Sequence, residues 1–247
     1  FFRFDLGYWG LDYPPLTAYV SWLCGKVSTM VEPGSMALGL SRGYETPSHK
    51  AFMRLTVLLL DLGVFFGAAS ALAHRCAQIE VFVSKSSSCS AWSAATRMET
   101  TRVFAMVLLQ PSLILIDHGH FQYNSVCLGL AVGGVAAVSS RRPCGAEILG
   151  SILFSLSLNF KQMALYYSPA FFFWLLASCI RGTASPTAIA GGRSDTTPSA
   201  RGASVIGRVL RLGLVVALTF AVLWAPFCVY SDVAGGGRCL SSLRQAS

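Results

Sequence analysis

The stretch FMRLTVLLLDLGVFFGAASALA, at residues 52–73, decides the fold class of this chain. An α-helix that crosses a bilayer needs about 20 consecutive, mostly apolar residues, and this run has that length. Its charged residues, Arg54 and Asp61, are seven positions apart and therefore share one face of a helix. The stretch predicts a transmembrane helix. Within it, we expect Asp61 to make a structural polar contact rather than to serve as a proton relay.

Five further apolar runs extend this prediction along the chain. They occupy residues 103–116, 123–138, 148–158, 163–180 and 209–230. The runs 103–116 and 148–158 are short for a tilted crossing of about 17–25 residues, so each needs flanking residues or enters only part of the bilayer. The sequence therefore predicts an all-α protein, a polytopic transmembrane helical bundle with about six spans.

Composition supports a membrane protein and argues against other classes. Of the 247 residues, 53% are hydrophobic and 12% are charged, whereas a soluble domain averages about 25% charged residues. The net charge of +8 does not predict a nucleic-acid partner, because the basic residues are scattered between apolar runs. The eight cysteines show no CxxC and no regular spacing, which predicts neither a zinc site nor a disulfide framework.

The pattern of residues divides the chain into three regions. Residues 1–51 are expected to form a loop outside the membrane, with an interfacial helix at 16–27, where apolar residues recur at helical spacing. Residues 52–230 form the membrane region, and 231–247 form an unorganised tail. Within the membrane region, 84–90 and 182–204 are rich in small and polar residues, and we expect both to be disordered.

The positive charges predict how the bundle is oriented. If residues 1–50 are non-cytoplasmic, the cytoplasmic loops are 74–102, 139–147 and 181–208. These loops carry arginines, whereas the turns at 117–122 and 159–162 on the opposite side carry only Lys161. Such an excess of basic residues is typical of cytoplasmic loops. The polar segments near residues 12, 120 and 161 are therefore predicted to lie together on the non-cytoplasmic side.

Two prolines give the first polar segment a defined shape. Pro14 and Pro15 hold Asp12 and Tyr13 in an extended conformation. A carboxylate beside an aromatic ring suits sugar binding, because the ring stacks on the sugar and the carboxylate accepts hydroxyl hydrogen bonds. In the alternative interpretation, Asp12 caps the following helix and Tyr13 belongs to an interfacial aromatic belt.

The second polar segment, DHGHFQYN at residues 117–124, gathers hydrogen-bonding side chains in one short connection. Its imidazole, amide and phenol donors favour binding of a phosphate or a sugar. The HxH pair alone lacks the further ligands of a zinc site, and the remaining alternative is a polar turn among lipid headgroups. The candidate binding residues are Asp117, His118, His120, Gln122 and Asn124.

Two smaller groups complete the candidate binding residues. Lys161, Gln162 and Tyr166 offer a cation and donors at the edge of a span, although a lysine there also extends to headgroups without any substrate. Arg42 and Glu45, in the string SRGYE, offer a second cation and a carboxylate. For this pair a surface salt bridge is the competing interpretation.

Taken together, these strings resemble the endoplasmic-reticulum glucosyltransferases of asparagine-linked glycosylation, a family of the GT-C class. The matching strings are YWGLDYPPLTA (8–18), SRGYE (41–45), FMR (52–54), QPSLILIDHGHFQYNSV (110–126), FKQMALYYSP (160–169) and WAPF (224–227). They are ordered along nearly the whole chain, and the longer strings are highly specific. Within the family, they look like the member that adds the first glucose.

The resemblance implies a reaction. Glucose passes from dolichyl-phosphate-glucose, in α-1,3 linkage and with inversion, to the dolichyl-diphosphate high-mannose oligosaccharide on the luminal face. It implies a multi-pass protein of the endoplasmic-reticulum membrane that takes lipid-linked donor and acceptor, needs no cofactor or metal, and binds no nucleic acid. The alternatives are the second-glucose paralogue, a polytopic lipid or solute transporter, and a non-catalytic remnant.

The resemblance also implies where the catalytic base lies. In the family it is an acidic residue in a Gly-Asp-Tyr/Phe-Glu segment that precedes the YWGLDYPP string. Asp12 is then expected to be a supporting carboxylate rather than the base. We expect this chain to be a fragment that is inactive on its own.

Overall fold

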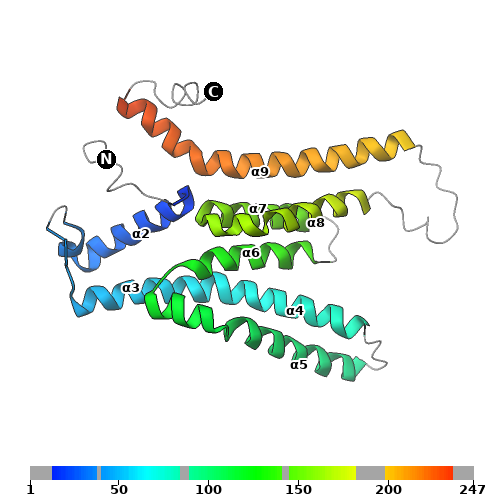
Figure 1. The fold of residues 1–247 in the computed structure, drawn as a ribbon, viewed down its shortest axis with the longest axis horizontal. Helices are drawn as coiled ribbons and strands as arrows, with labels where there is room; N and C mark the ends of the chain where they lie inside the picture. Colours follow the sequence, from blue (N-terminus) through cyan, green and yellow to red (C-terminus); the bar gives the residue numbers. More distant parts are fainter. Residues whose placement is uncertain (1–12, 38–39, 84–88, 141–144, 182–197, 236–247) are drawn as a thin grey trace. The chain divides into compact units, whose positions relative to one another are not determined.

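The computed structural model describes residues 13–37, 40–83, 89–140, 145–181 and 198–235, and the regular elements in these ranges are all helical (Figure 1). The chain divides into two compact units, Phe1–Ser178 and Cys179–Ser247, which are described separately. This helical architecture confirms the predicted all-α fold class.

The elements follow one another without any strand in the described ranges. Those that begin in the first unit are α2 Pro15–Val31, η1 Pro33–Met36, α3 Pro47–Leu60, η2 Asp61–Phe65, α4 Phe66–Val83, α5 Cys89–Leu108, η3 Leu113–His118, α6 Asn124–Val138, α7 Ala146–Phe160, η4 Gln162–Tyr167 and α8 Ser168–Arg181. The second unit contains α9, Pro198–Gly235. The segments η2 and η3 are π-helical, and η1 and η4 are 3₁₀-helical.

Helix α2 occupies the place of the predicted interfacial helix. Pro15 is its first residue, and proline suits this position because its missing N–H has no partner there in any case. The helix runs beyond the predicted end at residue 27 and packs against α3, η1 and α7. That α2 lies in a membrane interface stays a prediction.

The apolar stretch that decided the fold class forms one continuous helical rod, α3–η2–α4. Its start is capped by Thr46, whose hydroxyl accepts a hydrogen bond from the His49 N–H at 3.1 Å. Asp61 stands where the α-helix changes to the π-helical segment η2. Such single-turn widenings often occur at functional sites.

Three helical segments of the described chain are long and apolar enough to cross a membrane. They are Pro47–Ile79, Gln162–Ile180 and Val205–Cys228. They correspond to the predicted spans 52–73, 163–180 and 209–230. The predicted spans 123–138 and 148–158 form the shorter apolar helices Asn124–Val138 and Ala146–Phe160.

The predicted span 103–116 requires correction, since it is not one helix. Helix α5 ends at Leu108, and the π-helical segment η3 begins only at Leu113. Leu109 and Gln110 form the break, and Pro111 begins the next helical stretch, which leads into η3. A proline has no N–H to donate and clashes with the preceding turn, so it interrupts a helix even within an apolar run.

Helices occupy the edges of the segments for which disorder or an unorganised tail was predicted. Residues 84–88, 182–197 and 236–247 lie outside the described residues. However, α5 already begins at Cys89, and α9 extends from Pro198 to Gly235, so parts of both predicted loops and of the predicted tail are helical. Pro198 suits the first position of a helix, which a reading of composition alone did not take into account.

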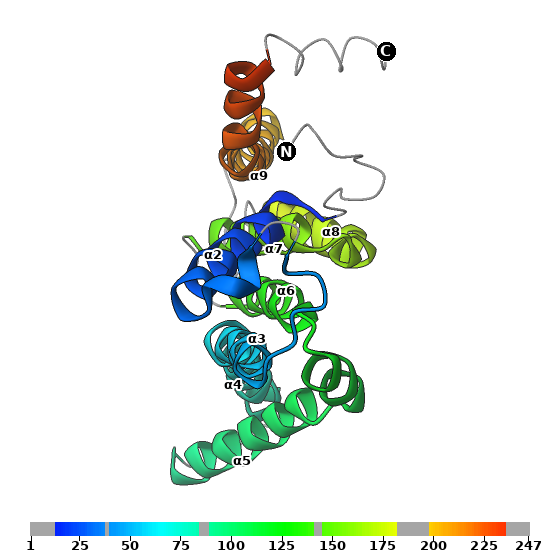
Figure 2. The same ribbon diagram turned by 90° about the vertical axis from the view of Figure 1, so that its left-hand side faces the viewer.

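Small residues bring the central helices of the first unit close together. Seen from the end of the unit, α6 lies between α4 and α7, with which it makes extensive contacts (Figure 2). A Cβ atom on Gly129 of α6 would lie only 2.9 Å from the Phe65 Cα, and one on Gly150 of α7 would lie 2.4 Å from the Val138 side chain. Glycine is required at both positions, because close backbone approach leaves no room for a side chain.

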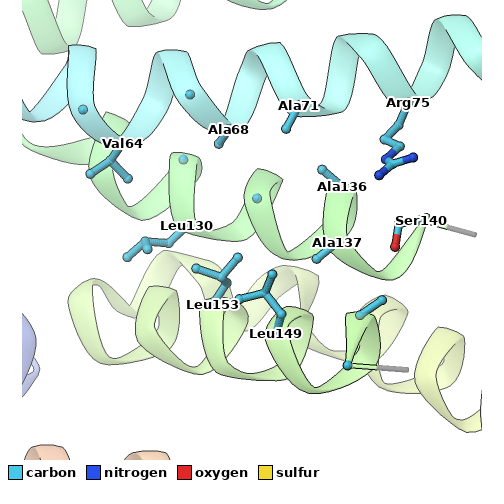
Figure 3. A pocket seen from close by; sticks show the side chains of 16 residues that line it. Val64, Ala68, Ala71, Arg75, Leu130, Ala136, Ala137, Ser140, Leu149 and Leu153 are labelled. Carbon is cyan, nitrogen blue, oxygen red and sulfur yellow. The ribbon is translucent and has the colours of Figure 1, made fainter. Parts of the chain in front are cut away.

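A groove of about 620 Å³ runs along these three helices (Figure 3). Its walls are small or aliphatic, and Arg75 and Ser140 stand at one end of it. The labelled lining residues otherwise are Val64, Ala68, Ala71, Leu130, Ala136, Ala137, Leu149 and Leu153. The polar site described next lies elsewhere, where η3, α6 and α7 end or begin.

Candidate functional site

Three segments that are distant in sequence meet through one chain of hydrogen bonds. Asn124, the first residue of α6, donates from its side-chain Nδ2 to Asp117 Oδ1 at 2.8 Å and to Gln122 Oε1 at 3.0 Å. Its other end, Oδ1, accepts from Lys161 Nζ at 2.5 Å. The Lys161 ammonium also lies 5.5 Å from the centroid of the Tyr13 ring. Tyr13, Asp117, Gln122, Asn124 and Lys161 are called the polar cluster below.

Local backbone geometry explains why these side chains meet. Helix α7 ends at Phe160, and Lys161 adopts an extended conformation, with φ −144° and ψ 141°, before the 3₁₀ turns of η4. The chain between η3 and α6 turns back at Phe121, whose φ of +55° is unusual for a residue with a side chain. The Gln122 N–H then bonds the Asp117 carbonyl oxygen at 3.2 Å and closes the turn.

The guanidinium of Arg54 lies against this turn. Its Cζ is 4.9 Å from the centroid of the Phe121 ring. A cation over an aromatic face is attracted by the electron density of the ring. Because left-handed backbone at a bulky residue is strained, it persists only where neighbouring contacts hold it. The contact with Arg54 is one that holds Phe121 in place.

Asp117 is the buried end of the polar cluster. Only 1% of its surface is exposed, whereas 51% of Tyr13 is exposed and Asn124 and Lys161 are partly buried. Burial raises the pKa of the Asp117 carboxyl above its ordinary value, and the hydrogen bond from Asn124 opposes this increase. A direct contact between Asp117 and a substrate, as expected from the sequence, receives no support from this burial.

A second buried carboxylate, Asp61, bonds the same turn of α6. It too is 1% exposed, and it accepts a hydrogen bond from the Ser125 hydroxyl. Ser125 directly follows Asn124, so the first turn of α6 donates to two buried acids through neighbouring side chains. The position of Asp61 agrees with the structural polar contact that its place in the apolar stretch suggested.

The other candidate residues do not join the polar cluster. Glu45 forms an exposed ion pair with Lys50, at 2.8 Å, which lowers the pKa of the Glu45 carboxyl. The predicted partner within that string, Arg42, is exposed in the turn that precedes it. His120, Gln162 and Tyr166 are exposed, and Tyr166 is 88% exposed. Asp12 lies outside the described residues, as does the side chain of His118.

Four polar residues outside the list of candidate binding residues lie beside the cluster, and one of them, Tyr123, belongs to the second polar segment. The Thr17 hydroxyl donates to the Phe160 carbonyl oxygen, and Thr56 and Tyr123 share a hydrogen bond of 2.8 Å between their hydroxyls. Ser125 is the fourth. Thr17, Tyr123 and Ser125 all lie within the long motif strings, which was the available signal, but their partners become visible only in the fold.

Thr17, Thr56 and Tyr123 also line a cavity of about 250 Å³ between α2 and α3. The same cavity receives Cys24 and His49. Nowhere in the described residues, this cavity included, are three His, Cys, Asp or Glu side chains grouped so as to hold a metal ion. That the site needs no metal or cofactor stays a prediction, since Asp12 and the His118 side chain are not described.

The polar cluster is suited to bind an anion that carries a sugar. A lysine ammonium has three donors, and here one is used by Asn124. Charge-assisted hydrogen bonds to phosphate are among the stronger contacts that such a group makes. The exposed ring of Tyr13 beside it offers a flat apolar surface of the kind that packs on a sugar face.

Fold and site together define a polytopic helical membrane protein with a lysine-containing polar cluster at the ends of its helices. Comparison with known proteins gives the family. Residues 3–238 match the ALG6, ALG8 glycosyltransferase family, and the chain belongs to that family. This confirms the resemblance that the motif strings indicated.

Several curated relatives are about 40% identical to this chain over the residues that align. A Dictyostelium discoideum protein, named probable dolichyl pyrophosphate Man9GlcNAc2 alpha-1,3-glucosyltransferase, is 43% identical over 223 residues, which are 90% of this chain and 37% of the relative. The correspondingly named Gallus gallus protein is 41% identical over 91% of this chain and 37% of its own length. The Saccharomyces cerevisiae protein is 35% identical over 229 residues, which are 90% of this chain and 35% of the relative. The chain thus spans little more than a third of the length of these relatives.

Proposed function

We propose that this chain is part of an enzyme that transfers the first glucose in assembly of the lipid-linked oligosaccharide. The donor is dolichyl-phosphate-glucose, and the acceptor is the dolichyl-diphosphate high-mannose oligosaccharide before any glucose is present. Family membership supports a glycosyltransferase. The names of the relatives specify Man9GlcNAc2 as the acceptor and α-1,3 as the linkage, which favours the first glucose over the second.

The Lys161 ammonium in the polar cluster is the observation that carries the proposal. When the sugar leaves the donor, negative charge develops on the departing dolichyl phosphate. Donors fixed in advance at that position lower the barrier. Lys161 is held by Asn124 at the end of α7 and beside the exposed Tyr13 ring. In this arrangement the ammonium faces the phosphate while the ring packs on a sugar.

The bond changes assign the remaining roles. The acceptor hydroxyl attacks the anomeric carbon on the face opposite the phosphate, so the β-linked donor gives an α-linked product. The bond between the anomeric carbon and the phosphate oxygen breaks, and its electron pair leaves with the dolichyl phosphate. The hydroxyl proton passes to a carboxylate base. We assign that base to an acidic residue upstream of the YWGLDYPP string and a supporting role to Asp12.

The location follows from the charge distribution. Arginines are concentrated in the loops on one side of the predicted bundle, and the segments that carry Asn124 and Lys161 lie on the other. We therefore place the polar cluster on the luminal face of the endoplasmic-reticulum membrane. Cysteine labelling in sealed microsomes checks this: positions 124 and 141 should label from opposite sides, and labelling from the same side would contradict the topology.

A chimera tests the proposed activity. The segment of the Saccharomyces cerevisiae relative that matches this chain is replaced by the chain itself, and the purified chimera is supplied with dolichyl-phosphate-glucose and a dolichyl-diphosphate oligosaccharide. We expect one glucose to be added to Man9GlcNAc2. The relative with its own segment is the positive control, and the same chimera lacking donor is the negative control.

The competing functions give different results in the same assay. A second-glucose enzyme would leave Man9GlcNAc2 unchanged and extend the monoglucosylated acceptor. A non-catalytic remnant would give a chimera that inserts into membranes, unfolds cooperatively and transfers no glucose to either acceptor. Either outcome would overturn the proposal. Transfer of glucose by the chimera in detergent would contradict a transporter, because detergent solution has no compartments to transport between.

A further inference from the structure

We propose that Asn124 is an uncharged spacer that holds the Lys161 ammonium in position without neutralising it, and that buried Asp117 fixes the orientation of this spacer. The inference rests on the proposed function, because it takes Lys161 to contact the donor phosphate. It changes the role of two residues that the sequence suggested as direct substrate contacts. In the structure, Asp117 and Asn124 act through Lys161 and are positioning residues.

The orientation of the Asn124 amide follows from its partners. An asparagine side chain has a donor end and an acceptor end, and it can bind in either of two orientations. Here the donor end meets two acceptors, Asp117 Oδ1 at 2.8 Å and Gln122 Oε1 at 3.0 Å. The acceptor end is therefore directed to Lys161 Nζ. The reverse orientation would place an N–H against an ammonium and a carbonyl oxygen against a carboxylate.

Asp117 is suited to fix this orientation because it is buried beneath the Asn124 amide. It is 1% exposed, and its Oδ2 is buried with no hydrogen-bond partner within the described residues. A substrate on the surface cannot reach such a group directly. Its influence passes outward through Asn124 to Lys161, the first member of this hydrogen-bond chain that carries a positive charge.

The exposed pair Lys50–Glu45 shows what the spacer avoids. There a lysine ammonium lies 2.8 Å from a carboxylate oxygen, and the two charges cancel. Lys161 instead meets a neutral amide oxygen, and in the described part of the chain no carboxylate forms an ion pair with it. A lysine held in this way retains its full charge and free donors for an incoming phosphate.

A double-mutant cycle in the chimera tests the spacer. Asn124→Asp preserves shape but gives Lys161 a direct ion-pair partner that competes with phosphate. We expect the KM for dolichyl-phosphate-glucose to rise about tenfold, with a smaller change in kcat. Asp117→Asn should raise the same KM about threefold, because the charge-assisted hydrogen bond from Asn124 to the carboxylate is replaced by a neutral one. In a Lys161→Met background, both effects should disappear, since their target is gone.

Asp61→Asn is the matched control. It alters a carboxyl of equal burial that bonds the neighbouring residue of the same helical turn. We expect it to leave the KM for the donor within about twofold of the parent chimera and to be additive with Lys161→Met. Should Asn124→Asp fail to fold, Asn124→Ala replaces it in the cycle. This change releases Lys161, so the KM should again rise and the rise should vanish with Lys161→Met.

Failure of the inference differs from failure of the proposed function. If the parent chimera transfers no glucose, the proposed function is wrong. If the parent is active but Asn124→Asp has the same effect with and without Lys161, Asn124 acts on substrate or on folding and the spacer is excluded. A KM that is unchanged in Asn124→Asp would exclude it equally.

Discussion

Asp61 and Asp117 are alike in their surroundings and unlike in what they are connected to. Each carboxyl is 1% exposed, each lies in a π-helical segment, and each accepts a hydrogen bond from the first turn of α6. The Asp61 bond is to Ser125, a buried side chain. The Asp117 bond is to Asn124, which continues to Lys161 at the surface.

The comparison shows that burial alone does not tell whether an acidic residue has a structural role or a role in the site. The two carboxyls are equally hidden from solvent, at 1% exposure each. Among the side-chain bonds from the first turn of α6, the two differ in the residue that donates to them and in where that residue leads. The Asp61 bond ties η2 to α6 within the core, whereas the bond of Asp117 leads to the one cation of the polar cluster.

The largest expected effect comes from removing Lys161, the residue at the surface end of the hydrogen-bond chain that starts at Asp117. Lys161→Met in the chimera should lower kcat/KM for the donor by an amount equivalent to about 2–4 kcal/mol, because a charge-stabilising contact in the transition state is lost. Glucose transfer from dolichyl-phosphate-glucose measures it. Lys50→Met, which removes the lysine of an exposed pair, is the control and should retain full activity. Equal activity of both variants would remove the basis for separating the two acids.

The next effect concerns Asp61 and falls on stability. Asp61→Ala leaves the Ser125 hydroxyl without this acceptor in the core and should lower the free energy of unfolding by about 1–3 kcal/mol. Thermal unfolding in detergent measures it. The KM for the donor should not change. A variant with normal stability and impaired donor binding would show that Asp61 belongs to the site.

A smaller effect is the pH dependence of stability, to which the carboxyls of Asp117 and Glu45 contribute with opposite signs. Burial raises the pKa of Asp117, so the folded state binds its proton more tightly than the unfolded state. Its contribution to stability is full below the unfolded value of about 3.9 and is lost as the pH rises through the folded value. Asp117→Asn should remove this loss, so its melting temperature relative to the parent should rise with pH.

Glu45 gives the contrasting case in the same pH series. The bond from Lys50 lowers the pKa of the Glu45 carboxyl. The pair therefore contributes above the unfolded value of about 4.3, and the contribution is lost as the pH falls through the folded value. Glu45→Gln should remove this contribution, so its melting temperature relative to the parent should rise as the pH falls. The same sign in both variants would show that burial does not govern Asp117.

The smallest expected effect is that of Glu45→Gln on catalysis. The residue was a candidate for substrate binding, yet its carboxylate is exposed and paired with Lys50. Exposed ion pairs contribute little to stability, and this one lies outside the polar cluster. We expect kcat/KM for the donor to be unchanged. A clear loss, with donor and acceptor titrated separately, would return Glu45 to the binding site and show which substrate it contacts.

Sequence patterns predicted the fold class and the position of the polar cluster for identifiable reasons. The length of apolar runs determines where helices begin and end, and polar residues that interrupt such runs collect at their edges. In the structure, Asn124 and Lys161 meet where α6 begins and α7 ends. Pro111 was a visible sign that 103–116 would not be one helix, but the continuing apolar residues outweighed it.

What sequence patterns did not predict depends on contacts between distant segments. The burial of Asp117 depends on the π-helical turn of η3, which has no simple signature in composition. The choice of Lys50 over Arg42 as the partner of Glu45 depends on how the loop meets α3. The bond from Thr17 to the Phe160 carbonyl joins residues 143 positions apart, and periodicity within either segment says nothing about it.

The two side-chain bonds from the first turn of α6 have a further consequence for the angle at which that helix is set. Successive residues of an α-helix point about 100° apart around its axis. Asn124 and Ser125 therefore pull on α6 from two different directions, toward Asp117 and toward Asp61. Together the two bonds restrain rotation of α6 about its axis, in addition to its packing against α4 and α7. The angular setting of every side chain on α6, including those along the groove with α4 and α7, is thereby coupled to the pair of acids at its start.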